Sequence, residues 1–271
     1  MKISVLGGSG FVGTNLAHVF SKKNISFEIF DIKKSETFPN QSIIGSICST
    51  KDLDKIQDSN VIINLAAVHR DDVSPKSLYD EVNVNGSRNV CEYATKNNIK
   101  HIIFTSSVAI YGFAKPNTDE SGEINYFNDY GRTKYLAEQE YIKWYSENPN
   151  ERSLVIIRPT VIFGEGNRGN VFNLLNQIRS KKFVMFGNGK NEKSMAYIKN
   201  LVSFIDYSLT LNRGINIYNY IDKPDMNMNQ LVLFVRKKLF NKNNIGVRLP
   251  KILGFLIGII ADFFAKLINR N

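Results

Sequence analysis

Cysteine is scarce in this 271-residue sequence, which contains only Cys48 and Cys91. Two cysteines are too few for a disulfide framework and lack the spacing of metal ligands, so we expect packed free thiols and no metal site. The first residues also lack the charged region, long apolar run and cleavage site of a secretory signal peptide. The sequence therefore predicts a protein that stays in a reducing cytoplasm.

Acidic residues are fewer than basic ones, with 25 Asp and Glu against 35 Lys and Arg, which gives a formal net charge of +10. No helical stretch combines clustered basic side chains with interleaved aromatic ones, so we expect no nucleic-acid partner. The excess charge suits an anionic membrane surface or a phosphorylated ligand. The composition, with 43% hydrophobic and 22% charged residues, excludes disordered, collagen-like and polytopic membrane chains.

Short apolar runs alternate with helical patterns through the first 160 residues. The expected strands are Ile3–Leu6, Phe27–Asp31, Ser42–Ile47, Val61–Ala67, His101–Ser107 and Leu154–Arg158. This βαβ rhythm predicts an α/β fold with a Rossmann-type, doubly wound parallel sheet.

After Pro159 the pattern loosens, and we expect residues 161–271 to form a smaller second lobe. Its expected helices are Val171–Lys181, Leu201–Leu211 and Met228–Leu239, with short strands near Met195–Ile198 and Asn216–Tyr220. From Ile252 to Ile268 only Asp262 and Lys266 are charged, and the apolar run is too short to span a bilayer comfortably. A helix there would be apolar on most sides, so it would either pack into a protein core or lie in a membrane interface.

A glycine-rich turn follows the first expected strand, with the sequence Gly7-Gly8-Ser9-Gly10-Phe11-Val12-Gly13. Such a turn lets the backbone approach a pyrophosphate at a helix N-terminus. Asp31 closes the second strand, where a carboxylate can bind both hydroxyls of an adenosine ribose. These features predict that residues 1–160 bind NAD rather than NADP, although Lys33 and Lys34 leave tolerance of NADP open.

A second group of polar residues is suited to proton transfer. Tyr130 and Lys134 lie four residues apart on an expected helix, so they share a face, and the ammonium can lower the pKa of the phenol. Ser107, at the end of its strand, is placed to hydrogen-bond the same substrate hydroxyl. We interpret these three as catalytic residues, with Tyr130 as the base.

Together these residues resemble the extended short-chain dehydrogenase/reductases of the NAD-dependent epimerase and dehydratase family. The resemblance includes Asn64–Ala67, Asn83–Val90, Ser107–Gly112 and Arg158–Gly164. It implies NAD as the cofactor and a homodimer formed through the helices that carry the Tyr–Lys pair. The cofactor contacts that it implies are Gly7, Gly10, Phe11, Val12, Asp31, Ser46, Ile47, Leu65, Ala66, Tyr130, Lys134 and Pro159.

Within this family, 4,6-dehydratases place an acidic residue directly after the strand-end serine or threonine, where this chain has Val108 and Ala109. The difference favours oxidation and re-reduction at one carbon. The segments His69–Pro75, Asn167–Val171, Lys193–Tyr197 and Tyr218–Asp225 are similar to those of bacterial 4-epimerases that act on polyprenyl-diphosphate-linked N-acetylhexosamines during surface-polysaccharide assembly.

This similarity implies that Val108, Arg168, Asn170 and Lys193 bind substrate, and that the protein is peripheral on the inner face of the bacterial cell membrane. The resembling enzymes continue beyond the point where this chain stops, so a shortened second lobe is expected. Two alternatives stay open: the same chemistry on UDP-N-acetylglucosamine, and a non-catalytic NAD-binding scaffold or sensor.

Overall fold

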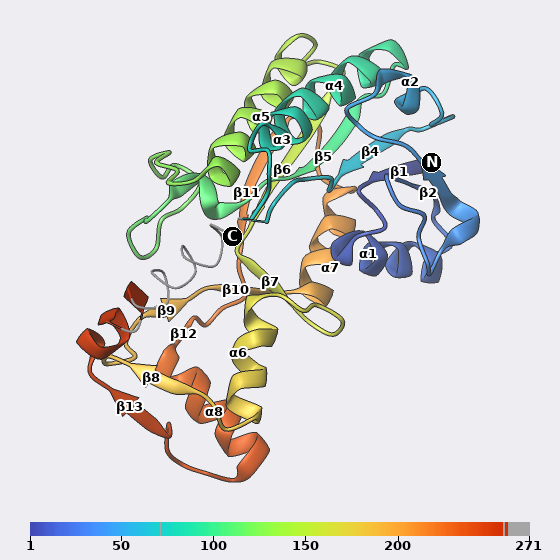
Figure 1. Ribbon diagram of the computed structural model, residues 1–271. Coiled ribbons are helices and arrows are strands. Elements are labelled where there is room, and N and C mark those ends of the chain that lie inside the picture. The colour runs from blue at the N-terminus through green and yellow to red at the C-terminus, as the bar shows by residue number, and fades with distance from the viewer. Residues whose placement is uncertain (71, 257, 260–271) are drawn as a thin grey trace. The chain divides into compact units, whose positions relative to one another are not determined.

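The computed structural model describes residues 1–70, 72–256 and 258–259, and the chain folds as two compact units (Figure 1). The first unit contains Met1–Gly164 and Ala196–Ile221, and the second contains Glu165–Met195 and Asp222–Asn271. Each unit is described separately below.

A seven-stranded parallel sheet forms the centre of the first unit, in the order β11-β6-β5-β4-β1-β2-β3. Its strands are β1 (Lys2–Leu6), β2 (Ser26–Asp31), β3 (Ser42–Ile44), β4 (Val61–Asn64), β5 (His101–Thr105), β6 (Ser153–Pro159) and β11 (Ile215–Tyr220). All residues of β6 are buried, which is why its centre, Leu154–Ile157, is continuously apolar rather than alternating. The doubly wound fold expected from the sequence is confirmed.

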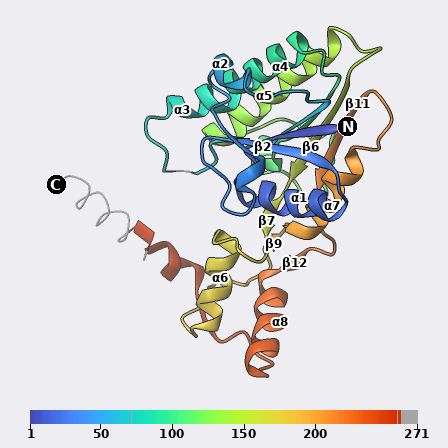
Figure 2. The same ribbon diagram turned by 90° about the vertical axis from the view of Figure 1, so that its right-hand side faces the viewer.

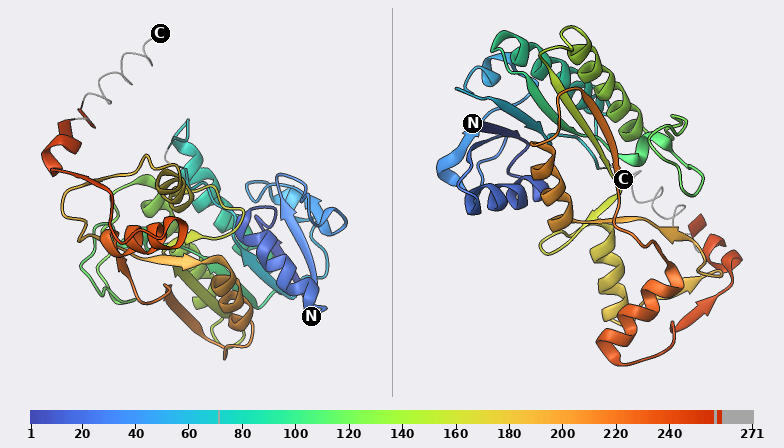
Figure 3. Two further views of the ribbon diagram at one scale, coloured as in Figure 1. Left: turned by 90° about the horizontal axis from the view of Figure 1, so that it is seen from below. Right: turned by 180° about the vertical axis from the view of Figure 1, so that it is seen from behind.

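Helices cover both faces of this sheet (Figure 3). On one face, α1 (Phe11–Lys22) packs beside α7 (Ile198–Ser208), and their apolar side chains form one core with Val5, Ile63 and Ile157. On the other face, α4 (Gly86–Lys96) and α5 (Asp129–Ser146) form a second core with the sheet. The shorter helices of this unit are η1 (Pro39–Gln41), α2 (Thr50–Leu53), α3 (Ser77–Tyr79), the π-helix η2 (Asp80–Asn85) and the 3-10 helix η3 (Val108–Tyr111).

The structure divides the chain differently from the sequence-based boundary at residues 160 and 161. Residues 196–221 were expected in the second lobe, but they belong to the first unit. The reason is that β11 pairs with β6 along its whole length, while α7 buries its apolar face against α1. The chain therefore enters the second unit at residues 165–195 and returns to complete the first unit with residues 196–221.

The second unit is built around α6 (Asn170–Arg179) and α8 (Met228–Phe240), which pack side by side (Figure 2). Ile178, Met185 and Val232 form its small core. Its strand pairs are β8 (Val184–Phe186) with β13 (Val247–Leu249) and β9 (Glu192–Lys193) with β12 (Met226–Asn227). The short strands β7 (Val161–Phe163) and β10 (Met195–Tyr197) lie where the chain leaves and re-enters the first unit.

Only the start of the expected C-terminal helix can be described. Residues 251–256 and 258–259 are helical, whereas Ile257, residues 260–268 and Asp71 of the segment His69–Pro75 lie outside the described residues. Within the described ranges, no helix is both long and apolar enough to cross a bilayer. Cys48 and Cys91 are free thiols, as expected.

Candidate active site

The glycine-rich turn connects β1 to α1 through a close approach of backbone segments. A Cβ added to Gly7 would lie 2.6 Å from the Ala66 backbone nitrogen, and φ at Gly7 is +73°. A Cβ added to Gly13 would lie 2.5 Å from the carbonyl oxygen of Gly8. Glycine is therefore required at both positions, so that the turn can lie against the end of β4 and α1 can lie against the turn.

Asp31 lies at the end of β2, beside the same turn. Its carboxylate oxygens accept backbone hydrogen bonds from Ser9 (3.0 Å) and Lys33 (3.1 Å). These bonds fix the carboxylate near the glycine turn while each oxygen keeps a lone pair for a ribose hydroxyl. This arrangement fits the adenosine ribose of NAD and disfavours the 2′-phosphate of NADP.

We expect Asp31→Ala to reduce the preference for NAD over NADP, because it removes the carboxylate that accepts ribose hydroxyls and repels a 2′-phosphate. Titration of both cofactors measures the change in the ratio of the two dissociation constants. Glu36→Ala, which removes an exposed acid close by in the sequence, is the matched control. Equal losses of affinity for NAD and NADP would contradict this role for Asp31.

Five further cofactor residues expected from the sequence lie at or just after the ends of β3, β4 and β6. Ser46 follows β3 in a turn in which its hydroxyl accepts a hydrogen bond from the Cys48 backbone (3.2 Å), and Ile47 is buried. The Leu65 amide extends the pairing of β4 with β1, and Ala66 lies against Gly7. Pro159 ends β6. Their contacts with NAD stay a prediction.

The start of α5 brings Tyr130 to Ser107. The Asn128 side chain caps the helix by accepting a hydrogen bond from the Gly131 amide (2.8 Å). Ser107 caps the short helix η3 (Val108–Tyr111), where its hydroxyl accepts one from Ala109 (3.2 Å). The two helix starts touch at Gly131, where an added Cβ would lie 2.5 Å from the Ala109 carbonyl oxygen. As a result, the Ser107 hydroxyl and the Tyr130 phenol form a hydrogen bond.

Gly131→Ala should separate these two helix starts, because the new methyl group has no room beside Ala109. We expect kcat to fall by about 10- to 100-fold, the loss that follows when a catalytic group moves by about 1 Å. Steady-state kinetics together with an NAD titration would measure the effect. Wild-type kcat in a folded variant would show that this contact does not position Tyr130.

Burial moves the pKa values of the Tyr–Lys pair in opposite directions. Burial raises the pKa of Tyr130, and the hydrogen bond from Ser107 opposes this rise. Burial lowers the pKa of Lys134 to about 7, while the negative charge of Glu138 opposes this decrease. Burial is the largest influence on the Tyr130 phenol, and the expected lowering of its pKa by Lys134 stays a prediction.

Lys134 is 2% exposed, and its ammonium lies 4.2 Å from the centre of the Phe104 ring. Nearby, the hydroxyls of Thr105 and Ser106 at the end of β5 are buried and have no hydrogen-bond partner among the described residues. Such unused capacity fits a site that receives a polar ligand. With the glycine turn and Asp31, these groups fit NAD.

A buried ion pair lies one helical turn beyond Lys134. Glu138 accepts two hydrogen bonds from the Arg158 guanidinium, at 3.0 and 2.7 Å, and both side chains are almost fully buried. Arg158 also donates to the Tyr111 hydroxyl, which donates to Asn219 (2.9 Å). Sequence analysis missed Glu138, although an acid four residues after Lys134 on the same helix face was a usable signal.

The residues expected to bind substrate are divided between the two units. Val108 begins η3 beside Ser107 in the first unit, whereas Arg168, Asn170 and Lys193 belong to the second. Asn170 is the first residue of α6, and Lys193 ends β9. Their contacts with substrate stay a prediction.

A doubly wound sheet with this glycine turn, an acid at the end of the second strand and a Ser–Tyr–Lys set defines the extended short-chain dehydrogenase/reductase class. The chain belongs to the NAD-dependent epimerase/dehydratase family, whose sequence profile matches residues 3–220. NAD is therefore its cofactor.

This chain is 48% identical to the N-acetyl-α-D-glucosaminyl-diphospho-ditrans,octacis-undecaprenol 4-epimerase of Escherichia coli O157:H7. The alignment covers 99% of this chain and 81% of that protein. A UDP-glucose 4-epimerase of Vibrio cholerae is 27% identical over 75% of this chain and 65% of its own length.

Among solved structures, MoeE5 in complex with UDP-glucuronic acid and NAD has a TM-score of 0.80 at 19% identity, over 92% of this chain and 86% of that one. The UDP-glucuronic acid 4-epimerase from Bacillus cereus in complex with NAD has a TM-score of 0.77 at 21% identity, over 93% and 88% of the two chains. These likenesses establish the fold.

Proposed function

We propose that this protein is an NAD-dependent 4-epimerase that interconverts N-acetylglucosaminyl- and N-acetylgalactosaminyl-diphospho-undecaprenol in surface-polysaccharide (O-antigen) synthesis. The observation that carries this proposal is the 48% identity, over 99% of the chain, to an enzyme named for this activity. The hydrogen-bonded Ser107–Tyr130 pair and the buried Lys134 supply groups suited to the chemistry.

Bound NAD would supply the redox chemistry, in which a hydride leaves C4 of the sugar and later returns to it. Tyr130 removes the proton of the 4-hydroxyl and later gives it back, and Ser107 orients that hydroxyl. To act as a base despite its raised pKa, Tyr130 requires a positive charge nearby during the reaction. The protonated Lys134, one turn along the same helix, is the side chain placed to supply it.

Epimerisation also requires that no second group eliminates water from the sugar. The helix η3 that follows Ser107 has no acidic residue in its first turn, where Val108 and Ala109 stand. This supports oxidation and re-reduction at C4 without elimination. Once the 4-keto sugar has rotated in the site, the hydride returns to the opposite face of C4.

Basic and amide side chains of the second unit are proposed to bind the diphosphate, namely Arg168, Lys193 and Asn170.

A polyprenyl substrate is embedded in a bilayer, so the proposal includes peripheral attachment to the inner face of the bacterial cell membrane through residues 252–268. It also includes a homodimer formed through α5, the helix that carries Tyr130 and Lys134. Deletion of residues 252–271 should greatly weaken binding to anionic liposomes, as measured by sedimentation and compared with the circular dichroism of the deletion variant.

Parallel incubation with polyprenyl-diphosphate-linked and UDP-linked N-acetylglucosamine, followed by sugar analysis, tests the proposal. We expect N-acetylgalactosamine from the lipid-linked substrate at a far higher rate. Faster conversion of the UDP-linked sugar would show that the substrate is UDP-N-acetylglucosamine rather than the lipid-linked sugar. No conversion of either sugar by NAD-loaded protein would favour a scaffold or sensor.

A further inference from the structure

The net charge of the protein is confined to one of its two units. The first unit contains 20 Lys and Arg and 20 Asp and Glu, so its formal charge is zero. The second unit contains 15 Lys and Arg against 5 Asp and Glu, which accounts for the whole +10. An anionic partner would therefore be attracted to the second unit rather than to the NAD-binding unit.

Helix α8 of this second unit has two apolar faces, and only one of them is buried. Met228, Val232 and Val235 pack in the core that contains Ile178, and Leu231 is also buried. On the other face, Leu233 is 38% exposed and Phe234 is 52% exposed. A helix that needed one apolar stripe for folding would carry polar residues on this second face.

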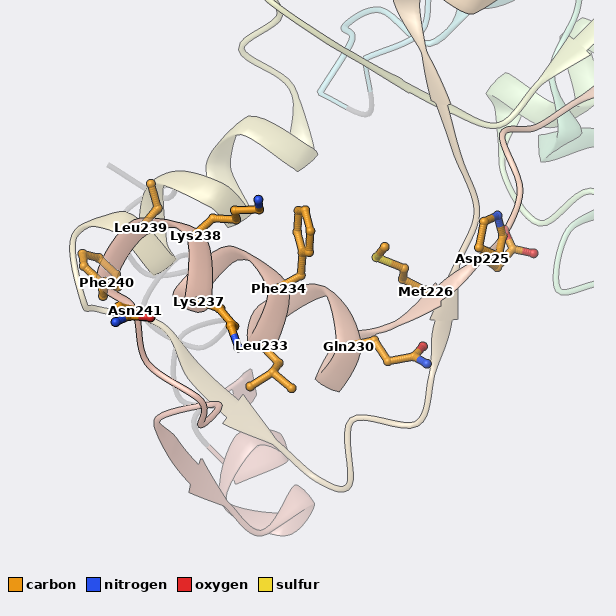
Figure 4. Close-up of a pocket in the computed structure, with 11 residues that line it drawn as sticks. Asp225, Met226, Gln230, Leu233, Phe234, Lys237, Lys238, Leu239, Phe240 and Asn241 are labelled. Atoms are coloured by element: carbon orange, nitrogen blue, oxygen red, sulfur yellow. The ribbon is translucent and has the colours of Figure 1, made fainter.

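This outer face lines a groove of about 1100 Å³ (Figure 4). Its apolar wall is made by Pro224, Met226, Leu233, Phe234, Leu239 and Phe240. Lys237 and Lys238 lie on the same surface in the last turn of the helix, and the Lys238 ammonium is 5.9 Å from the centre of the Phe234 ring. Apolar side chains flanked by lysines suit a layer in which hydrocarbon lies beneath negatively charged headgroups.

We infer that the outer face of α8, formed by Leu233, Phe234, Lys237 and Lys238, docks onto an anionic phospholipid membrane. This inference deepens the proposed function and rests on it for its purpose, because it names a surface that would hold the enzyme beside a lipid-linked substrate. The same unit also exposes Ile252 and Phe255, at 67% and 70%, which gives the membrane a second apolar contact. A second copy of this chain fits the face less well, because two units of equal positive charge repel each other.

Sedimentation with vesicles of phosphatidylcholine, with and without phosphatidylglycerol, tests the inference in the full-length NAD-loaded protein. One variant combines Leu233→Gln with Phe234→Gln, and another combines Lys237→Gln with Lys238→Gln. Each lysine should contribute about fivefold to the binding of anionic vesicles, equivalent to about 1 kcal/mol per basic residue at such a surface. The lysine pair should therefore weaken binding by roughly 25-fold, and the apolar pair by at least about tenfold.

The matched control replaces an exposed aromatic residue and an exposed lysine of the first unit, Phe113→Gln with Lys115→Gln, and should bind vesicles as the wild type does. Circular dichroism and NAD titration show that each variant is folded. Wild-type vesicle binding by both α8 variants would overturn the inference. Dissociation of an oligomer without loss of vesicle binding would also overturn it, and would assign the face to a second copy.

The two proposals fail in different ways. If the enzyme converts the undecaprenyl substrate but the α8 variants bind vesicles normally, the docking surface is wrong and the proposed function stands. If the variants lose vesicle binding but the enzyme converts only the UDP-linked sugar, the proposed substrate is wrong and the docking surface stands.

Discussion

Tyr130→Phe should lower kcat by about 10²- to 10⁴-fold, the usual loss when a general base is removed. The variant keeps the aromatic ring of residue 130 but lacks the oxygen that interacts with Ser107 and exchanges a proton with the sugar. NAD binding should change little, because the glycine turn and Asp31 are untouched. Steady-state kinetics and an NAD titration measure the two effects.

Tyr135→Phe is the matched control for this experiment, since it removes a phenol oxygen from the next turn of the same helix. We expect it to retain wild-type kcat. If Tyr130→Phe kept more than roughly a tenth of the wild-type rate, Tyr130 would not be the base.

Glu138→Gln should destabilise the first unit by about 3–5 kcal/mol, because it leaves the Arg158 guanidinium buried without its carboxylate. The midpoint of thermal unfolding should fall by roughly 10 °C. Glu28→Gln is a suitable control: Glu28 is also buried, but its partner Lys2 reaches solvent, so its loss should cost much less.

The same variant should change the pH dependence of catalysis. Glu138 raises the pKa of Lys134, so removal of its negative charge lowers that pKa further below about 7. Lys134 then loses its proton at lower pH, and the alkaline limb of the kcat/KM profile should shift downward by on the order of one pH unit. A destabilised variant with an unchanged pH profile would show that the ion pair is structural and does not tune Lys134.

Local sequence patterns were enough to predict much of the fold. The short, mostly apolar segments of β1 and β6 and the glycine turn identify the doubly wound sheet, because each signal lies within a few residues. The place of β11 could not be predicted in this way. Its pairing with β6 depends on contacts between segments about 60 residues apart, and the intervening residues form part of the second unit.

The candidate site shows the same division between local and distant signals. Tyr130 and Lys134 are recognisable because one helix sets their spacing. The partnership of Glu138 with Arg158 joins α5 to β6, and the π-helix η2 places Asn83 so that its side chain binds both Val68 and Thr133. These contacts arise from packing between elements that are distant in sequence, so neither residue spacing nor composition predicted them. Likewise, the charge imbalance between the units became visible only once the boundaries of those units were known.

The most direct test of the account is the fate of deuterium placed at C4 of N-acetylglucosamine in the lipid-linked substrate. If C4 is oxidised and re-reduced within one site, without release of the hydride to solvent, the N-acetylgalactosamine product should retain deuterium at C4. Mass spectrometry of the released sugar measures this retention in ordinary water. Product that has lost the label would contradict hydride transfer and return at C4, and with it the roles assigned to Ser107, Tyr130 and Lys134.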